Sequence, residues 1–330
     1  MKREGFYLSC DHKTKIHAVA WIPENREIRA VIQLCHGMTE YVNRYDEFAR
    51  WLAEKGYYVT GHDHLGHGQS VLSEEDYGYF PEKRGNECVI GDIRKLFLAT
   101  KKRYPDCPYF MLGHSMGSFL LRQYIQNYGK ELTGAIVMGT GYKPYPLLVA
   151  GGLLCSAIGK LRGGHYRSRL VDNMAFGGYN KSFEPGKTGR EWLSANPENV
   201  VHYEEDPLCG FLFTVTAYRQ MFRGMKTLTK KGVANIPKDL AVLFVSGDKD
   251  PVGDFGAGVW RVYEQYRKAG MKDVEIQLYS GDRHEILNET DRETVLRDLY
   301  AWLYVRASDP RRENRKRVFE KIADWMAKRE

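Results

Sequence analysis

The chain has 330 residues, of which 43% are hydrophobic and 28% charged, as in a globular protein with a large buried core. The longest apolar stretch, residues 146–158, is too short to span a bilayer, which argues against a transmembrane helix. The formal net charge is +7, but no nucleic-acid-binding motif accompanies it, so we expect no nucleic-acid partner.

The first 140 residues alternate between strand-like and helix-like segments. Residues 5–9 and 15–22 predict a β-hairpin, and the continuous apolar run at 29–35 predicts a strand that is buried on both faces. Further strands are predicted at 57–61, 109–113 and 134–139, and helices at 43–55, 87–103 and 116–128. This β-α-β rhythm predicts an α/β fold whose mostly parallel central sheet has helices on both faces.

The rhythm breaks after Gly141. Residues 142–236 contain no clean strand but show helical patches near 146–161, 189–195 and 211–228. The rhythm then resumes with strands at 240–246 and 273–279 and helices at 254–269 and 290–304. We therefore expect one core, formed by residues 1–141 and 237–305, that is interrupted by a helical cap at 142–236.

The C-terminal tail, residues 306–330, is basic, with nine Lys or Arg and five Asp or Glu. Between 314 and 328, apolar residues recur at helical spacing: Val318, Phe319, Ile322, Trp325 and Met326. This pattern predicts an amphipathic helix that packs on the core or on a partner chain, and it leaves the oligomeric state open.

Six irregularly spaced cysteines are present, and none forms a C-x-x-C pair. The first residues, Met1-Lys2-Arg3-Glu4-Gly5, lack the apolar core of a secretory signal peptide. We therefore expect reduced thiols and a cytoplasmic protein.

Ser115 is the candidate nucleophile. It lies in a G-H-S-M-G run between the strand at 109–113 and the helix at 116–128. A sharp strand-to-helix turn exposes such a side chain, and it needs small neighbours, which Gly113 and Gly117 supply. The N-terminus of the following helix then favours a developing oxyanion.

A serine hydroxyl needs a base, and the expected chain order is serine, acid, histidine. His284 follows the predicted strand at 273–279 and is the candidate base. Asp250 follows the strand at 240–246 and is the preferred acid, because Asp248 lies too close to the strand end and Asp254 is expected to cap the next helix.

The loop after the first central strand is the candidate oxyanion loop. It reads His36-Gly37-Met38, and Gly37 would let the backbone turn so that the Met38 amide faces the site. Met116, directly after the nucleophile, would supply the other amide. His36 is expected to hold the loop by hydrogen bonds.

Residues 62–70 contain three histidines and an aspartate, which raises the alternative of a metal site. Their glycine spacing and their position after a strand favour a structural turn near the site. We therefore predict no metal and no cofactor.

Taken together, these motifs resemble those of the α/β-hydrolase fold, and within it the monoacylglycerol lipase and lysophospholipase-like branch that is grouped with serine aminopeptidases. The cap is more similar to that of bacterial members, and Ser118 stands where the family often has glycine. The resemblance spans residues 30–290 and rests on five motifs: His36-Gly37-Met38-Thr39-Glu40 with Arg44-Tyr45, Asp63-x-x-Gly66-x-Gly68-x-Ser70, Gly113-His114-Ser115-Met116-Gly117, Gly247-x-x-Asp250-Pro251-Val252 and Gly281-x-x-His284-Glu285.

The resemblance implies a serine carboxylic ester hydrolase that cleaves a lipid-like monoester, a monoacylglycerol or lysophospholipid, through an acyl-enzyme. It also implies a cap that covers the acyl pocket and that could contact the membrane surface, because residues 146–161 are apolar. Two alternatives stay open: a non-catalytic binding protein of this fold, and an aminopeptidase or amidase whose cap acids bind an ammonium group, the candidates being Glu184, Glu204, Glu205 and Asp206.

Overall fold

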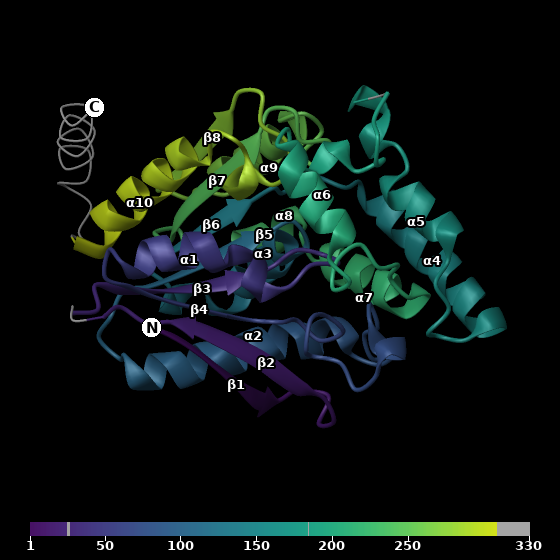
Figure 1. Cartoon of the computed structure of the whole chain (residues 1–330), viewed down its shortest axis with the longest axis horizontal. Coiled ribbons are helices and arrows are strands. Elements are labelled where there is room, and N and C mark those ends of the chain that lie inside the picture. The colour runs from purple at the N-terminus through teal and green to yellow at the C-terminus, as the bar shows by residue number, and fades with distance from the viewer. Residues whose placement is uncertain (25–26, 184, 309–330) are drawn as a thin grey trace.

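The computed structural model describes residues 1–24, 27–183 and 185–308 (Figure 1). Within these residues, eight strands form one sheet in the order β1-β2-β4-β3-β5-β6-β7-β8. The β1–β2 and β2–β4 pairs are antiparallel, and all other neighbours are parallel, as the alternating pattern predicts. The strands are β1 (Lys2–Leu8), β2 (Lys15–Trp21), β3 (Ala30–Cys35), β4 (Tyr57–His62), β5 (Tyr109–His114), β6 (Gly134–Met138), β7 (Ala241–Gly247) and β8 (Val274–Tyr279).

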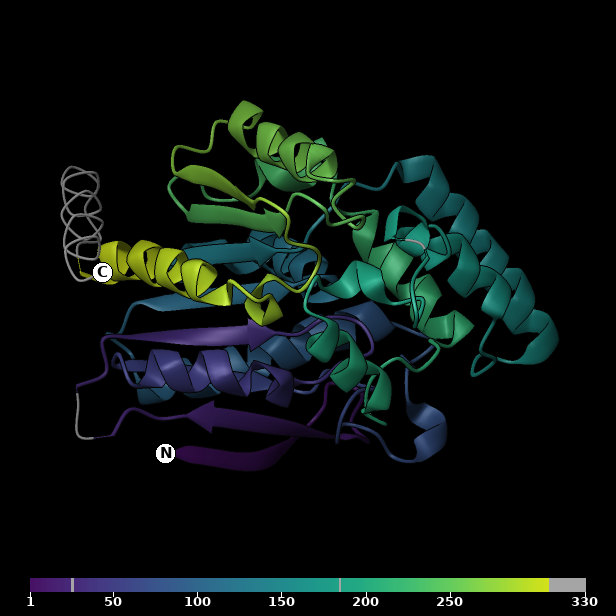
Figure 2. The same cartoon turned by 45° about the horizontal axis from the view of Figure 1, so that its top comes forward.

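Helices cover both faces of this sheet (Figures 1 and 2). On one face, α1 (Asp46–Ala53) and α10 (Arg292–Ser308) pack against the strands, and on the other α2 (Gly85–Arg103), α3 (Met116–Tyr128) and α9 (Ala257–Lys268) do so. Every residue of β3, β4, β5, β6 and β7 is buried, because both faces are covered.

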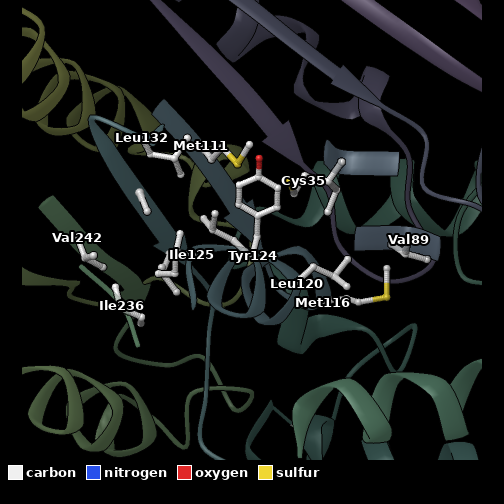
Figure 3. Close-up of a cluster of buried hydrophobic side chains, with 14 of the residues drawn as sticks. Cys35, Val89, Met111, Met116, Leu120, Tyr124, Ile125, Leu132, Ile236 and Val242 are labelled. Carbon is white, nitrogen blue, oxygen red and sulfur yellow. The ribbon is translucent and has the colours of Figure 1, made fainter. Parts of the chain in front are cut away.

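The packing beneath α3 fixes the position of the predicted nucleophile. Figure 3 shows Leu120, Tyr124 and Ile125 of α3 in one cluster with Met111 of β5 and Val242 of β7. Removing a side chain from such a core costs about 2–5 kcal/mol. The N-terminus of α3, where the candidate nucleophile lies, is therefore held firmly against the sheet.

In the described residues between β6 and β7, five α-helices form: α4 (Tyr145–Arg162), α5 (Arg169–Phe176), α6 (Pro197–Glu205), α7 (Val215–Met225) and α8 (Lys230–Ala234). In both views α4 to α7 lie beyond the carboxyl ends of the parallel strands (Figures 1 and 2). The patches predicted at 146–161 and 211–228 correspond to α4 and α7. The helix predicted at 189–195 is wrong, because only a 3-10 turn forms at Glu191–Leu193.

The helix predicted from residue 254 begins later, so the capping role expected of Asp254 is wrong. Gly256 precedes the first helical residue, Ala257, and both Asp254 and Gly256 have positive φ angles, of 52° and 87°. Asp254 contributes only its backbone carbonyl, which accepts a hydrogen bond from Ala257 N at 3.0 Å.

Helix α10 continues past the predicted end at residue 304 to Ser308. The reason is Arg306, which is buried and forms ion pairs with Asp273, at 2.7 Å, and with Glu275. The amphipathic helix predicted at 314–328 lies outside the described residues. The residue boundaries of the core and the cap stay a prediction.

All six cysteines lie in the described part of the chain, and all are free. Across residues 1–24, 27–183 and 185–308, no helix combines the length and the apolar character that crossing a bilayer requires.

Candidate active site

Ser115 occupies a strained turn between β5 and α3. Its φ and ψ angles are 53° and −117°, a conformation that non-glycine residues rarely adopt. A Cβ atom on Gly113 would collide with the carbonyl oxygen of Gly117, and one on Gly117 would collide with that of Cys35. The two glycines are therefore required by close backbone approach, as the motif predicts.

The structure brings Asp250 and His284 together. The Nδ1 atom of His284 donates to Oδ2 of Asp250 at 2.9 Å, and both side chains are buried. Burial alone would raise the pKa of Asp250. The facing His284 and hydrogen bonds from Val252 N, at 2.8 Å, and Ser246 Oγ, at 3.1 Å, outweigh it and hold this pKa below its usual value. An ionised Asp250 keeps the proton on Nδ1 of His284.

The rival acids point elsewhere. The Oδ1 atom of Asp248 accepts from Gly281 N at 2.9 Å and lies 3.6 Å from Lys249 Nζ. Asp254 is exposed and sits before α9. Of these three acids, Asp250 is thus the one that is hydrogen-bonded to His284.

Met38 and Met116 line the same cavity as Ser115. Met116 is the first residue of α3, where backbone amides have no partner within the helix. A Cβ atom on Gly37 would lie 3.2 Å from the Ser115 Cβ atom, so the Gly37–Met38 loop passes directly beside the serine. This geometry suits the predicted oxyanion role of the two amides, which stays a prediction.

A buried ion network fixes this loop to the one that carries His284. The Arg44 guanidinium donates to Glu285 Oε1 at 2.6 Å and Oε2 at 2.7 Å, and to Glu40 Oε2 at 3.0 Å. Burial alone would raise the pKa of both carboxyl groups. Hydrogen bonds and charges, from His114 and Arg44 on Glu40 and from Arg44 and Asn199 on Glu285, lower each pKa instead.

The His114 side chain also contacts both of these loops. Its Nδ1 atom lies 3.1 Å from Glu40 Oε1, and its Nε2 atom lies 3.1 Å from the carbonyl oxygen of His284. Burial would lower the pKa of His114, but the hydrogen bond and charge of Glu40 raise it above the usual value. A protonated His114 can therefore donate to both loops at once.

Glu40, Arg44 and Glu285 belong to the motifs of the family resemblance, but no role was predicted for them. Their chemistry was the signal that could have indicated a role. Arg44 lies four positions after Glu40, and Glu285 is next to the candidate base. Their pairing spans 241 positions of the chain, and the pattern alone could not show it.

Two cavities meet at Ser115. The larger, about 290 Å³, is almost entirely apolar and is lined by Leu148, Leu154, Val171, Met174, Met221, Phe222 and Met225, among others. The smaller, about 40 Å³, has polar groups in its wall, including Asp172, Arg190 and Tyr203. Met38, Ser115 and Phe176 line both cavities, so the serine stands between an apolar and a polar compartment.

The histidine-rich segment at 62–70 forms a buried turn, as its glycine spacing predicts. The Asp63 carboxylate accepts from Val42 N, Gln69 N and His17 Nδ1, each at 2.9 Å. Burial lowers the pKa of His62 and of His67 to about 3. Among the described residues, no group of three or more His, Cys, Asp or Glu side chains is arranged to hold a metal ion.

His36 holds the loop as expected, because its Nε2 atom accepts a hydrogen bond from His64 N at 2.8 Å.

Of the four cap acids considered for an aminopeptidase, the three that the structure describes line neither cavity. Glu204 pairs with Arg190 at 3.2 Å, Asp206 accepts from Tyr41 Oη at 2.7 Å, and Glu205 is exposed. Glu184 lies outside the described residues. Asp172, which was not predicted, is the cap acid at the smaller cavity, where its Oδ1 atom accepts from Tyr218 Oη at 2.7 Å.

The profile of one protein family, described as serine aminopeptidase, S33, matches residues 26–291. The chain belongs to this family. It is 27% identical over 290 residues to a monoacylglycerol lipase of Mycolicibacterium smegmatis, covering 86% of this chain and 90% of that protein. It is 26% identical over 310 residues to the monoglyceride lipase of Mus musculus, covering 91% and 88% of the two chains.

Solved structures of similar fold include a thermostable carboxyl esterase from Bacillus coagulans in complex with glycerol. That structure has a TM-score of 0.86 and 27% identity, covering 93% of this chain and 99% of the other. A lipase in an open form has a TM-score of 0.83 and 26% identity, covering 94% and 100%. These likenesses confirm the predicted α/β-hydrolase fold and identify the protein as a hydrolase.

Proposed function

We propose that this protein hydrolyses lipid-like carboxylic monoesters through an acyl-enzyme formed on Ser115. The observation that carries the proposal is the position of Ser115 between the apolar and the polar cavity, with His284 on the wall of the smaller cavity and hydrogen-bonded to Asp250 behind it. An acyl chain suits the apolar side, and a small polar alcohol suits the other.

In the proposed mechanism, His284 Nε2 accepts the Ser115 hydroxyl proton as the oxygen attacks the ester carbonyl. Asp250 holds the Nδ1 proton and stabilises the imidazolium. The amides of Met38 and Met116 donate to the oxyanion, and His284 returns its proton to the departing alcohol. Water, activated in the same way, then releases the carboxylic acid and restores Ser115.

The size of the two cavities supports a monoester as substrate. About 40 Å³ on the polar side leaves room for little more than a small alcohol, whereas a second acyl chain would need a second large apolar space. The Mycolicibacterium and mouse relatives are monoacylglycerol lipases, and the Bacillus esterase binds glycerol, which agrees with this size.

An amidase or aminopeptidase is the second candidate, because Asp172 lies at the smaller cavity and could face an ammonium group. The apolar lining of the larger cavity favours the ester. A panel of monoacylglycerols, lysophospholipids, diacylglycerols and aminoacyl amides, ranked by kcat/KM, separates the two. We expect monoesters to lead by at least about tenfold and Ser115→Ala to lose at least about 1,000-fold. Faster cleavage of aminoacyl amides would contradict the ester proposal.

We also propose that the cap contacts an anionic lipid surface through α4 and α5. Leu153, Leu161 and Leu170 are 66%, 83% and 58% exposed, and the last turn of α4 carries Lys160 and Arg162. Exposed apolar residues next to basic ones are typical of interfacial helices.

Sedimentation with phosphatidylglycerol vesicles tests this contact. The triple variant L153S/L161S/L170S is expected to bind at least about fivefold more weakly, because each substitution removes apolar area that lipid contact would bury. Leu72→Ser, at a residue that is 61% exposed on the core, is the matched control and should bind as the unmodified protein does. Equal binding of all three proteins would contradict the contact.

A further inference from the structure

The apolar cavity contains one positive charge that the proposed ester hydrolysis does not use. Lys143 lines the cavity and is half-buried, whereas none of the residues that line it is acidic. The Nζ atom of Lys143 lies 3.1 Å from Tyr179 Oη and 5.4 Å from the centre of the Tyr179 ring. A neutral hydroxyl and a ring face satisfy an ammonium group only in part.

Two further cations surround the segment that carries Lys143. Arg122 is 2% exposed, and its guanidinium donates to Thr140 Oγ1 at 3.2 Å and to the Gly141 carbonyl oxygen at 3.0 Å. Its Nε atom is buried without a hydrogen-bond partner. Arg261 lies over the Tyr142 ring at 4.5 Å.

None of these three cations forms an ion pair with a carboxylate in the part of the chain that the structure describes. An arginine or lysine charge inside a protein is normally compensated, because leaving it unpaired in a medium of low polarity is costly. Arg261 is exposed, and of the three cations Lys143 is the one that lines the cavity. Lys143 therefore places a positive charge, with no acidic residue beside it, in a largely apolar wall. A methionine would fill the position of Lys143 without that cost.

We propose that the apolar cavity selects acyl chains that carry an anionic group, a carboxylate on the distal part of the chain, and that Lys143 binds this group. The inference rests on the proposed esterase function and names a substrate class for the same site. The substrate is then a monoester of a dicarboxylic acid. Hydrolysis breaks its one ester C–O bond, water supplies the hydroxyl of the new acid and the proton of the alcohol, and the distal carboxylate is unchanged.

The test compares two series of p-nitrophenyl esters of equal chain length. The neutral series is octanoate and decanoate, and the anionic series is the monoesters of octanedioic and decanedioic acid. For each protein the readout is the ratio of kcat/KM for the anionic ester to that for the neutral one, which cancels any loss of folded enzyme. The proteins are the unmodified enzyme, Lys143→Met, Lys143→Arg and, as the matched control at an exposed residue of α8, Lys231→Met.

We expect the ratio to fall at least about tenfold in Lys143→Met, the effect of losing one charged hydrogen bond. It should stay within about threefold in Lys143→Arg and Lys231→Met. Raising the salt concentration should lower the ratio in the unmodified enzyme. An unchanged ratio in Lys143→Met would overturn the inference and leave the esterase intact, whereas no hydrolysis of either series by the unmodified enzyme would overturn the proposed function itself.

Discussion

Two segments of the cap differ in the kind of contact that they make. Residues 190–213, here termed the anchored segment, are tied to the catalytic loops by polar contacts: Asn199 Nδ2 donates to Glu285 Oε2 at 2.7 Å, Glu285 N to the Leu193 carbonyl at 2.8 Å, and Tyr203 Oη to the Thr39 carbonyl at 3.1 Å. Residues 145–176, the pocket segment, comprise α4 and α5 and line the large cavity with apolar side chains.

This difference separates two tasks. Hydrogen bonds have strict geometry, so the anchored segment suits the positioning of His284 and of the oxyanion loop. Apolar contacts have no preferred direction, so the pocket segment can adjust to acyl chains of different length. We therefore expect changes in the anchored contacts to reduce kcat and changes in the pocket segment to alter substrate preference.

Among changes that test this comparison of the two segments, the largest effect is expected from Arg44→Met. This change leaves Glu285 buried without its cation and Glu40 with His114 alone, which costs about 3–5 kcal/mol of stability. Because both catalytic loops then lose their common partner, we expect kcat to fall at least about 100-fold with a smaller change in KM. Urea unfolding and steady-state kinetics on p-nitrophenyl octanoate measure the two effects.

Arg44→Lys is the control for charge. It keeps the cation but loses the two-pronged contact, so it should recover stability more than kcat. A variant Arg44→Met that folds and retains normal kcat would contradict the positioning role of the anchored contacts.

A smaller effect, confined to selectivity, is expected from Gly151→Leu in the pocket segment. A Cβ atom at this position would already lie 2.8 Å from the Phe222 ring, so a leucine must displace that ring or fill part of the cavity. We expect kcat/KM for decanoate to fall about tenfold relative to acetate. Gly152→Leu is the matched control, because a Cβ atom there meets nothing within 4 Å. Equal losses for both esters would show that the pocket does not set chain length.

The smallest effect is expected on the pH dependence of stability and comes from His67. Its buried ring packs on Phe211 and Phe213 at the end of the anchored segment. Burial lowers the pKa of His67 to about 3, whereas an unfolded histidine has a pKa near 6.5. The unfolded chain therefore binds more protons between these values, so this contribution to stability is complete above pH 6.5 and is lost as the pH falls.

Urea unfolding between pH 7 and pH 5 measures this contribution. His67→Gln should reduce the pH dependence of the free energy of unfolding by on the order of 1 kcal/mol per pH unit. The same slope in the variant and in the unmodified protein would mean that His67 is not held neutral in the folded state.

The core of the fold was predictable from the sequence because each of its signals is local. A buried parallel strand appears as an apolar run, as in β3, and Gly113 and Gly117 mark the turn around Ser115. The order of motifs then indicated Asp250 and His284, which the structure brings to 2.9 Å. Local chemistry and chain order were sufficient for these features.

The cap was predicted less well, because its helices depend on partners distant in sequence. Helix α5 was missed, and so was α6, although Asn196 and Pro197 form a recognisable start with a side-chain cap at 3.1 Å. Asp254 was misassigned because Asp254, Phe255 and Gly256 all have positive φ angles, and this left-handed turn delays the start of α9 to Ala257. The Arg44–Glu285 pair, 241 positions apart, gave no local signal.

Labelling with a fluorophosphonate, followed by peptide mass spectrometry, tests whether Ser115 is the nucleophile of an acyl-enzyme. We predict one covalent adduct, on the peptide that contains Ser115, and loss of both the adduct and esterase activity in Ser115→Ala. An adduct on another residue, or a Ser115→Ala protein that still hydrolyses p-nitrophenyl octanoate at the original rate, would contradict it.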